Sequence, residues 1–151
     1  MPDTPPEFDI RKSPGFLINM MARKTGSLLH KVFKENGYNI TAPQWSVLNL
    51  LWREEGMIQS RLAEGISSDR HTISRIIRLM EKQDLVYRAP DEQDKRAFRV
   101  FLTDHGRHLQ SVLPPLAIKT AGIAFAGVSF EDIAVLIRIL NTISDNIDAN
   151  S

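Results

Sequence analysis

The segment from Asp69 to Lys82 is the part of this 151-residue chain that most constrains its fold. Four apolar residues follow the spacing i, i+3, i+4, i+7: Ile73, Ile76, Ile77 and Met80. This spacing places them on one face of a helix, and such a face must be buried against other elements. The segment therefore predicts an amphipathic helix whose opposite, polar face is available for function.

A tight turn and a hairpin flank this helix. Upstream, a short helical stretch that offers Leu62 and Ala63 for burial ends in the turn Gly-Ile-Ser-Ser, residues 65–68. Downstream, the runs LVYRA and AFRVFL are rich in β-branched and aromatic residues and bracket a loop with Pro90, which is typical of a two-stranded hairpin. Two helices, a tight turn between them and a hairpin predict a winged helix-turn-helix.

Local signals also mark the helices before this region. A proline in the first turn at Pro14 and a stop at Gly37 predict one long helix. Thr41 and Gln44 form a T-x-x-Q capping box, which predicts a second helix that runs through Trp52.

Beyond the hairpin, Thr103 predicts the start of a helix that must kink or restart at Pro114-Pro115, because tandem prolines remove two amide donors. Ser129 predicts the cap of the last helix. That helix carries apolar residues at alternating spacings of three and four: Ile133, Leu136, Leu140, Ile143 and Ile147. This heptad seam favours a partner helix, and burial against the first helix of the same chain is compatible with it.

The composition indicates a soluble globular protein of about one domain, with 42% apolar and 25% charged residues. The absence of cysteine excludes disulfides, thiol catalysis and cysteine-ligated zinc. The sequence shows no signal peptide and no apolar run that would span a bilayer, so we expect a cytoplasmic protein without membrane contact. Because the net charge is only +1, a nucleic-acid surface would have to come from local clustering of charge.

The polar face of the segment 69–82 is mostly basic. Together with the preceding turn it supplies these candidate DNA contacts: Ser67, Ser68, Asp69, Arg70, His71, Thr72, Ser74, Arg75 and Arg78. Arginine can bond guanine bidentately in the major groove, while hydroxyls and helix-start amides hold phosphate. The alternative is a solvated helix face, but a hairpin in this position would bring its tip to the same duplex.

The loop DEQDKRAF, residues 91–98, lies at the predicted hairpin tip. Arg96 would insert into the minor groove, where narrow A·T-rich segments attract arginine. Asp94 would pair with Arg96 and fix its direction, and Lys95 would face phosphate. The alternative is that these are ordinary turn charges, which contribute little in water.

Residues 40–109 contain an ordered set of motifs: Gln44-Trp45, Leu62-Ala63, Asp69 with Thr72, Leu85-Val86-Tyr87-Arg88, Asp94-Lys95-Arg96 and Leu102-Thr103-Asp104-His105-Gly106. In these motifs the chain resembles the MarR family of bacterial and archaeal transcriptional regulators, and the resemblance extends over roughly residues 14–149. Gln83-Asp84 departs from the usual Lys-Gly before the wing, and Lys95 stands where a second arginine is common.

The resemblance implies an obligate homodimer in which the first and last helices of both subunits interlock. The expected fold is mainly α with a small β-hairpin wing: a flexible arm at 1–13, a winged helix-turn-helix at 41–106, and dimerisation helices at 14–40 and 107–151. The expected interface residues are Phe16, Leu17, Ile133, Leu136, Leu140, Ile143 and Ile147. Two-fold symmetry would set the recognition helices about one DNA turn apart on a pseudo-palindromic site.

The family also implies an effector site, because many members bind phenolic or other small aromatic carboxylates between the dimerisation helices and the winged domain. The candidate residues combine a cation with an apolar lining: Met20, Lys24, His30, Trp45 and Leu48. The alternative is that the apolar members belong to the core and that the two basic members are solvated.

Neither a metal or cofactor site nor a catalytic site is expected. His105 and His108 have a spacing that could seat a metal, but Asp104 is the only acid near them. The chain also contains no G-x-S-x-G, P-loop or H-E-x-x-H motif. The sequence thus predicts a homodimeric repressor that binds double-stranded DNA and is released by a small aromatic ligand. An alternative is a winged-helix module that holds a protein partner without a small-molecule effector.

Overall fold

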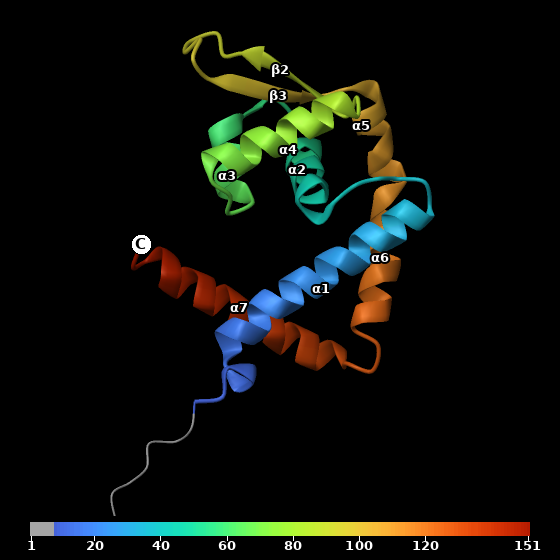
Figure 1. Ribbon diagram of the computed structural model, residues 1–151, viewed down its shortest axis with the longest axis vertical. Helices are drawn as coiled ribbons and strands as arrows, with labels where there is room; N and C mark the ends of the chain where they lie inside the picture. The colour runs from blue at the N-terminus through green and yellow to red at the C-terminus, as the bar shows by residue number, and fades with distance from the viewer. Residues whose placement is uncertain (1–7) are drawn as a thin grey trace, which may run out of the picture. The chain divides into compact units, whose positions relative to one another are not determined.

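The computed structural model describes residues 8–151 and consists mainly of helices with one small antiparallel sheet (Figure 1). In chain order the elements are η1 (Ile10–Lys12), α1 (Pro14–Glu35), α2 (Ala42–Arg53), β1 (Met57–Ile58), α3 (Gln59–Gly65), α4 (Arg70–Lys82), β2 (Val86–Pro90), β3 (Phe98–Leu102), α5 (Asp104–His108), η2 (Leu109–Ser111), α6 (Leu113–Ala124) and α7 (Phe130–Asp148). The predicted class, mainly α with a hairpin wing, is confirmed. The chain divides into one compact unit that ends at Thr120 and a second one, Ala121–Ser151.

The first helix has the predicted bounds. Pro14 lies in its first turn, and the chain leaves the helix through Gly37, whose φ of +90° suits glycine. Within the segment predicted as a flexible arm, residues 10–12 instead form a 3₁₀ turn, because the carboxylate of Asp9 accepts the amide of Arg11 at 3.0 Å. Residues 1–7 of the predicted arm lie outside the described residues.

The predicted capping box is confirmed and extends into a tertiary contact. The Thr41 hydroxyl accepts the amide of Gln44 at 3.4 Å, and Oε1 of Gln44 accepts the amide of Thr41 at 3.0 Å. The Gln44 side-chain amide then donates to Oε1 of Gln83 at 2.8 Å, and Nε2 of Gln83 donates to the carbonyl of Asn39 at 2.7 Å. These bonds tie the end of α4 to the start of α2.

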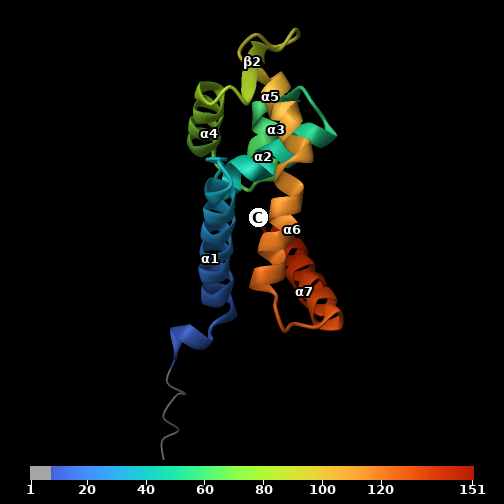
Figure 2. The ribbon, with the colours of Figure 1, turned by 90° about the vertical axis from the view of Figure 1, so that its right-hand side faces the viewer.

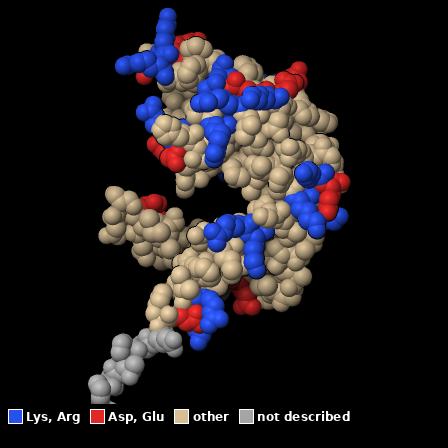
Figure 3. Space-filling model, in the orientation of Figure 1, with Lys and Arg blue, Asp and Glu red and all other residues tan. Residues whose placement is uncertain are grey.

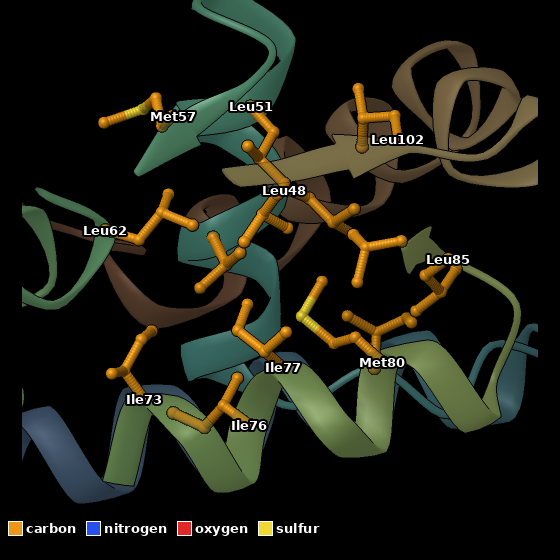
Figure 4. Close-up of a cluster of buried hydrophobic side chains, with 14 of the residues drawn as sticks. Leu48, Leu51, Met57, Leu62, Ile73, Ile76, Ile77, Met80, Leu85 and Leu102 are labelled. Atoms are coloured by element: carbon orange, nitrogen blue, oxygen red, sulfur yellow. The ribbon is translucent and has the colours of Figure 1, made fainter. Parts of the chain in front are cut away.

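The core of the first unit lies between α4, α2 and the sheet. Figure 4 shows side chains of α4 directed at α2 and at the strands, and Figure 2 shows α2 and α3 on the same side of α4. All four predicted apolar residues of α4 are buried: Ile73, Ile76, Ile77 and Met80. Leu48 and Leu51 of α2 are buried with them, so the predicted amphipathic helix and its inward face are confirmed.

The sheet has three strands in the order β1-β3-β2, so the prediction of a two-stranded hairpin was incomplete. β1 pairs antiparallel with β3, with Met57 opposite Val100. A strand of two residues has no alternation that a sequence pattern could reveal. Pro90, which was expected in the loop, is instead the last residue of β2 and lies opposite Phe98. Because β2 is an edge strand, it tolerates a proline.

Asp84, which replaces the usual glycine before the wing, adopts the left-handed conformation that glycine favours, with φ +55°. Its carbonyl accepts the hydroxyl of Thr103, and the amide of Thr103 bonds the carbonyl of Leu85 at 3.1 Å. Asp84 thus takes the backbone conformation that a glycine at this position would favour.

The tandem prolines restart a helix, as predicted. The chain passes from α5 through η2, and α6 begins at Leu113, one residue before Pro114. Both prolines thus lie in the first turn of α6, where backbone amides have no intrahelical acceptor to lose.

The second unit contains the end of α6 and all of α7. Ser129 caps α7 as predicted, because its hydroxyl accepts the amide of Asp132 at 3.1 Å. Within the described residues of one chain, no side chain of α7 is fully buried. Among the helices of residues 8–151, none has the length and apolar character that crossing a membrane requires.

Gly106 provides a test of the packing between α5 and the hairpin. A Cβ at this position would lie 2.2 Å from the carbonyl oxygen of Leu85, whereas a Cβ at Gly122 of α6 would meet no atom within 4 Å. We expect Gly106→Ala to lower the free energy of unfolding in urea by roughly 1–3 kcal/mol through overpacking. The matched change Gly122→Ala should raise it by about 0.5–1 kcal/mol. Equal effects of the two changes would contradict this packing.

Candidate nucleic-acid interface

The α4 helix presents a basic face opposite its buried stripe. Arg70, His71, Arg75 and Arg78 are exposed, and the guanidinium of Arg78 donates to the hydroxyl of Ser74 at 3.2 Å. Figure 3 shows Lys and Arg side chains gathered over α4 and at the tip of the hairpin. A helix with outward arginines and a neighbouring basic hairpin tip has the charge and the width to enter a DNA groove.

The start of α4 is held by a side-chain cap. Oδ1 of Asp69 accepts the amide of Thr72 at 2.7 Å, and Oδ2 accepts the hydroxyl proton of Thr72 at 3.1 Å. These two bonds, the backbone one first, lower the pKa of Asp69. Asp69 and Thr72, predicted as DNA contacts, are thus engaged in fixing the first turn of α4.

The turn before α4 borders a shallow cavity of about 300 Å³. Ser67 is exposed with a left-handed φ of +51°, and Ser68 is half-buried. The cavity is lined by these two serines and by Pro43, Ile66, Asp69, Thr72 and Ile76. It therefore lies beside the predicted phosphate-binding hydroxyls and involves none of the predicted effector residues.

The wing tip carries its arginine outward. The side chain of Arg96 is 95% exposed, and its Nε lies 3.6 Å from Oδ1 of Asp94. The same carboxylate oxygen accepts the backbone amide of Arg96 at 3.1 Å. Lys95, between them, is exposed. The structure thus brings together the pair that the sequence suggested, whereas its contact with DNA stays a prediction.

Two residues that sequence reasoning missed form the base of the wing. Asp91 is buried, with 9% of its side chain exposed, and its Oδ1 accepts Nε of Arg99 at 2.6 Å. This bond, together with the amide of Asp94, lowers the pKa of Asp91. Arg99 also donates from Nη1 to the carbonyl of Gly56 at 2.8 Å. The hairpin register, which sets Ala89 opposite Arg99, brings the pair together, and no sequence pattern gave that register.

A further contact joins the wing to α4. Arg88 of β2 forms a hydrogen-bonded ion pair with Glu81 of α4, and its guanidinium lies 5.1 Å from the ring centroid of Phe98. The sequence placed Arg88 in a family motif without giving it a role. In the structure it links β2 to α4 and to the aromatic ring of Phe98 at the start of β3.

The predicted effector residues have different environments within one chain. Leu48 is fully buried in the core, and Trp45 packs edge-on against Phe33 and Trp52 with centroid distances of 5.5 and 5.7 Å. The others lie on α1: Met20 is half-buried, Lys24 is exposed, and Nε2 of His30 lies 3.0 Å from Oδ1 of Asn39. Leu48 and Trp45 therefore pack as part of the core, and a ligand site at the predicted residues remains a prediction.

The predicted interface residues are accessible within one chain. Leu17, Leu136, Leu140 and Ile147 are exposed. Phe16, Ile133 and Ile143 are half-buried. His105 and His108 are both exposed on α5, and the described part of the chain brings no three potential metal ligands together.

Comparisons with known proteins agree on one family. The sequence profile of the MarR family matches residues 40–98. YybA of Bacillus subtilis, an HTH-type transcriptional regulator that is uncharacterised, is 30% identical over 131 residues, which are 87% of this chain and 86% of YybA.

Solved structures share the fold. PcaV of Streptomyces coelicolor, a transcriptional regulator in complex with its natural ligand, superposes with a TM-score of 0.78 at 24% identity, over 91% of this chain and 96% of PcaV. BpsR of Bordetella bronchiseptica, whose DNA binding is regulated by 6-hydroxynicotinic acid, superposes with a TM-score of 0.80 at 20% identity, over 91% of this chain and 97% of BpsR. The helices and the wing therefore follow a known regulator architecture.

The cap of α4 gives a pH-dependent prediction. Because the folded state holds the pKa of Asp69 below its ordinary value of 3.8, the stabilisation is complete above that value and is lost as the pH falls through the folded-state pKa. Asp69→Asn keeps an oxygen acceptor without a titrating group. We expect this variant to lose less stability than the wild type between about pH 4 and pH 2 in urea unfolding. Glu92→Gln, which removes a wing carboxylate, is the control. If the free energy of unfolding fell equally with pH in Asp69→Asn and in the wild type, Asp69 would not be the titrating cap of α4.

Proposed function

Since this chain belongs to the MarR family of transcriptional regulators, which bind DNA and are not enzymes, we propose that it is a homodimeric repressor of a pseudo-palindromic operator. The observation that carries the proposal is the exposed basic face of α4, set by the burial of its opposite face, beside a wing whose tip arginine points to solvent. We expect the protein to act in the cytoplasm, where the DNA lies.

The recognition helix would read the major groove. Arg70, His71 and Arg75 are the side chains proposed to reach base edges, because arginine can bond guanine O6 and N7 together. Residues around them would hold phosphate: Ser67, Ser68, Ser74 and Arg78. Thr72 would border the groove, because its hydroxyl proton is already donated to Asp69. Asp69 would act indirectly by fixing the start of the helix.

The wing would reach the adjacent minor groove. Arg96 is proposed to insert there, with its direction set by Asp94 and with Lys95 beside phosphate. The extension of the hairpin beyond the core supports this role, because a tip at that position can contact DNA outside the segment that α4 reads.

Dimerisation would come from the helices outside the winged domain. The seam of α7 has heptad spacing and is accessible within one chain, and Phe16 and Leu17 near the start of α1 are at most half-buried. A two-fold axis through such an interface would present two recognition helices about 10 base pairs apart.

We also propose that a small aromatic acid releases the protein from DNA. The support is the natural ligand bound in PcaV and the regulation of DNA binding of BpsR by 6-hydroxynicotinic acid, together with the cation Lys24 on the same helix as Met20. A ligand can act in this way only if it binds two dimer geometries with different affinity. Titration of benzoic and phenolic acids into the protein–DNA complex tests this point, and a failure of every such acid to change the DNA affinity would contradict it.

The DNA-binding proposal predicts a steep salt dependence. We expect fluorescence anisotropy on a labelled duplex from upstream of the gene to show specific binding that weakens as salt rises, because phosphate contacts release counterions. Arg96→Ala should weaken specific binding by about tenfold or more without unfolding the protein, since it removes an exposed groove contact. Lys95→Ala is the matched control and should lower specific and non-specific binding alike. Wild-type affinity in Arg96→Ala at every salt concentration would exclude the wing contact.

The dimer proposal predicts that one charge in the α7 seam separates the subunits. Leu140→Glu would bury a carboxylate between two helices, so we expect a monomer at micromolar concentration by analytical ultracentrifugation and a loss of operator binding. Asn141→Glu adds the same charge on the exposed polar face of α7 and should leave the dimer intact. A Leu140→Glu protein that sediments like Asn141→Glu would show that the seam is not the interface.

A further inference from the structure

Asp91 is a buried carboxylate that the proposed function does not use. Both of its oxygens are occupied: Oδ1 accepts Nε of Arg99 at 2.6 Å, and Oδ2 accepts the amide of Asp94 at 3.0 Å. Its own amide donates to the carbonyl of Ala97 at 2.9 Å, which closes the loop. A carboxylate with such neighbours fixes the position of several backbone and side-chain atoms at once.

On one side, Asp91 is connected to the body of the winged domain. Arg99 reaches the carbonyl of Gly56 with Nη1 at 2.8 Å, and the amide of Gly56 donates to the carbonyl of Val100 at 3.0 Å. Gly56 occupies a left-handed conformation, with φ +78°, in the turn just before β1. The base of the wing is thereby attached to the turn that begins the sheet.

On the other side, Asp91 is connected to the wing tip. The amide that it accepts belongs to Asp94, whose carboxylate in turn holds the backbone and the guanidinium of Arg96. The carbonyl of Asp94 also accepts the amide of Ala97 at 2.9 Å. A continuous path of polar contacts therefore leads from Gly56 through Arg99, Asp91 and Asp94 to Arg96.

We propose that Asp91 is a positioning residue for DNA recognition, which holds the wing loop so that Arg96 is presented to the minor groove. The inference rests on the proposed DNA contact of Arg96. Its physical basis is preorganisation, because a loop that is already ordered loses less conformational entropy when it binds. Because 95% of the Arg96 side chain is exposed, little packing restrains it, and the order of its loop comes from these polar contacts.

The direction in which DNA affinity changes when Asp91 loses its charge distinguishes a positioning role from simple charge repulsion. An acid close to DNA repels phosphate, so removing its charge should strengthen binding if charge alone matters. Loss of positioning should instead weaken specific binding. In Asp91→Asn the amide group keeps one oxygen acceptor but brings an N–H group against either Arg99 or the amide of Asp94, so one of the two bonds is lost.

The test uses the full-length protein and a duplex that the wild type has selected from random-sequence DNA. We expect Asp91→Asn to weaken binding to this duplex roughly five- to tenfold, while binding to a scrambled duplex stays the same or strengthens. Glu92→Gln, an exposed neighbour with the same change of charge, should leave specific binding unchanged or stronger. Weaker specific binding in both variants would overturn the proposal.

A double-mutant cycle with Arg96→Ala tests whether Asp91 acts through the tip. In the Arg96→Ala background, Asp91→Asn should change specific affinity by less than about twofold, because the group that it positions is gone. Fully additive losses would assign Asp91 to general stability of the wing and refute the proposed role. If Arg96→Ala alone has no effect, the proposed wing contact fails. If Arg96→Ala weakens binding and Asp91→Asn does not, the wing contact stands and this inference fails.

A second variant covers the possibility that Asp91→Asn does not fold. Arg99→Lys conserves the charge, but a lysine has one ammonium nitrogen, whereas Arg99 uses Nε for Asp91 and Nη1 for the carbonyl of Gly56. We expect the same selective loss of specific binding in Arg99→Lys, with a circular-dichroism spectrum like that of the wild type. Unchanged specific affinity in a folded Arg99→Lys protein would overturn the proposal.

Discussion

Burial of the apolar stripe of α4 against α2 and the sheet decides which face of that helix is turned outward. A fully buried isoleucine or methionine contributes about 1.5–3 kcal/mol, whereas an exposed ion pair contributes about 0–1 kcal/mol. Ile73, Ile77 and Met80 have at most 1% exposure, so a rotation of α4 about its axis would cost far more than its surface charges could recover. The arginines of α4 are therefore directed outward by packing on the opposite face.

The wing is held by a different kind of force. Val86, Val100 and Leu102 anchor the inner ends of its strands in the core, but the loop beyond them relies on polar contacts around Asp91 and Asp94. Such contacts are directional and specify geometry well, although each contributes little stability. The DNA-facing surface thus combines a helix fixed by apolar burial with a loop ordered by hydrogen bonds, and conditions that weaken polar contacts should affect the loop first.

Features that depend on neighbours in sequence were predictable. The caps of Thr41, Thr103 and Ser129 each join residues three apart, and each is present in the structure as predicted. Asp69, expected as a DNA contact, caps α4 across the same spacing. Contacts between distant residues were not predictable: β1 exists only through its pairing with β3, and the bond from Gln44 to Gln83 spans 39 positions. For the site, the composition of the basic face and the pairing of Asp94 with Arg96 could be read from the sequence. The support from Asp91 and Arg99 could not, because it requires the hairpin register. The effector and interface residues remain predictions, because an effector site needs a ligand and an interface needs a second subunit.

The aromatic cluster of α1 and α2 has a spectroscopic consequence. Both tryptophans of the chain lie in it: Trp45 packs against Phe33 and against Trp52. The indole of Trp52 donates to the carbonyl of Gly106 at 3.0 Å. Indole emission depends on the polarity and hydrogen bonding around the ring. The tryptophan fluorescence of this protein therefore arises where α1, α2 and α5 meet. Selective excitation of tryptophan leaves out Tyr87 of the wing, so this emission is a label-free signal of rearrangement at that junction.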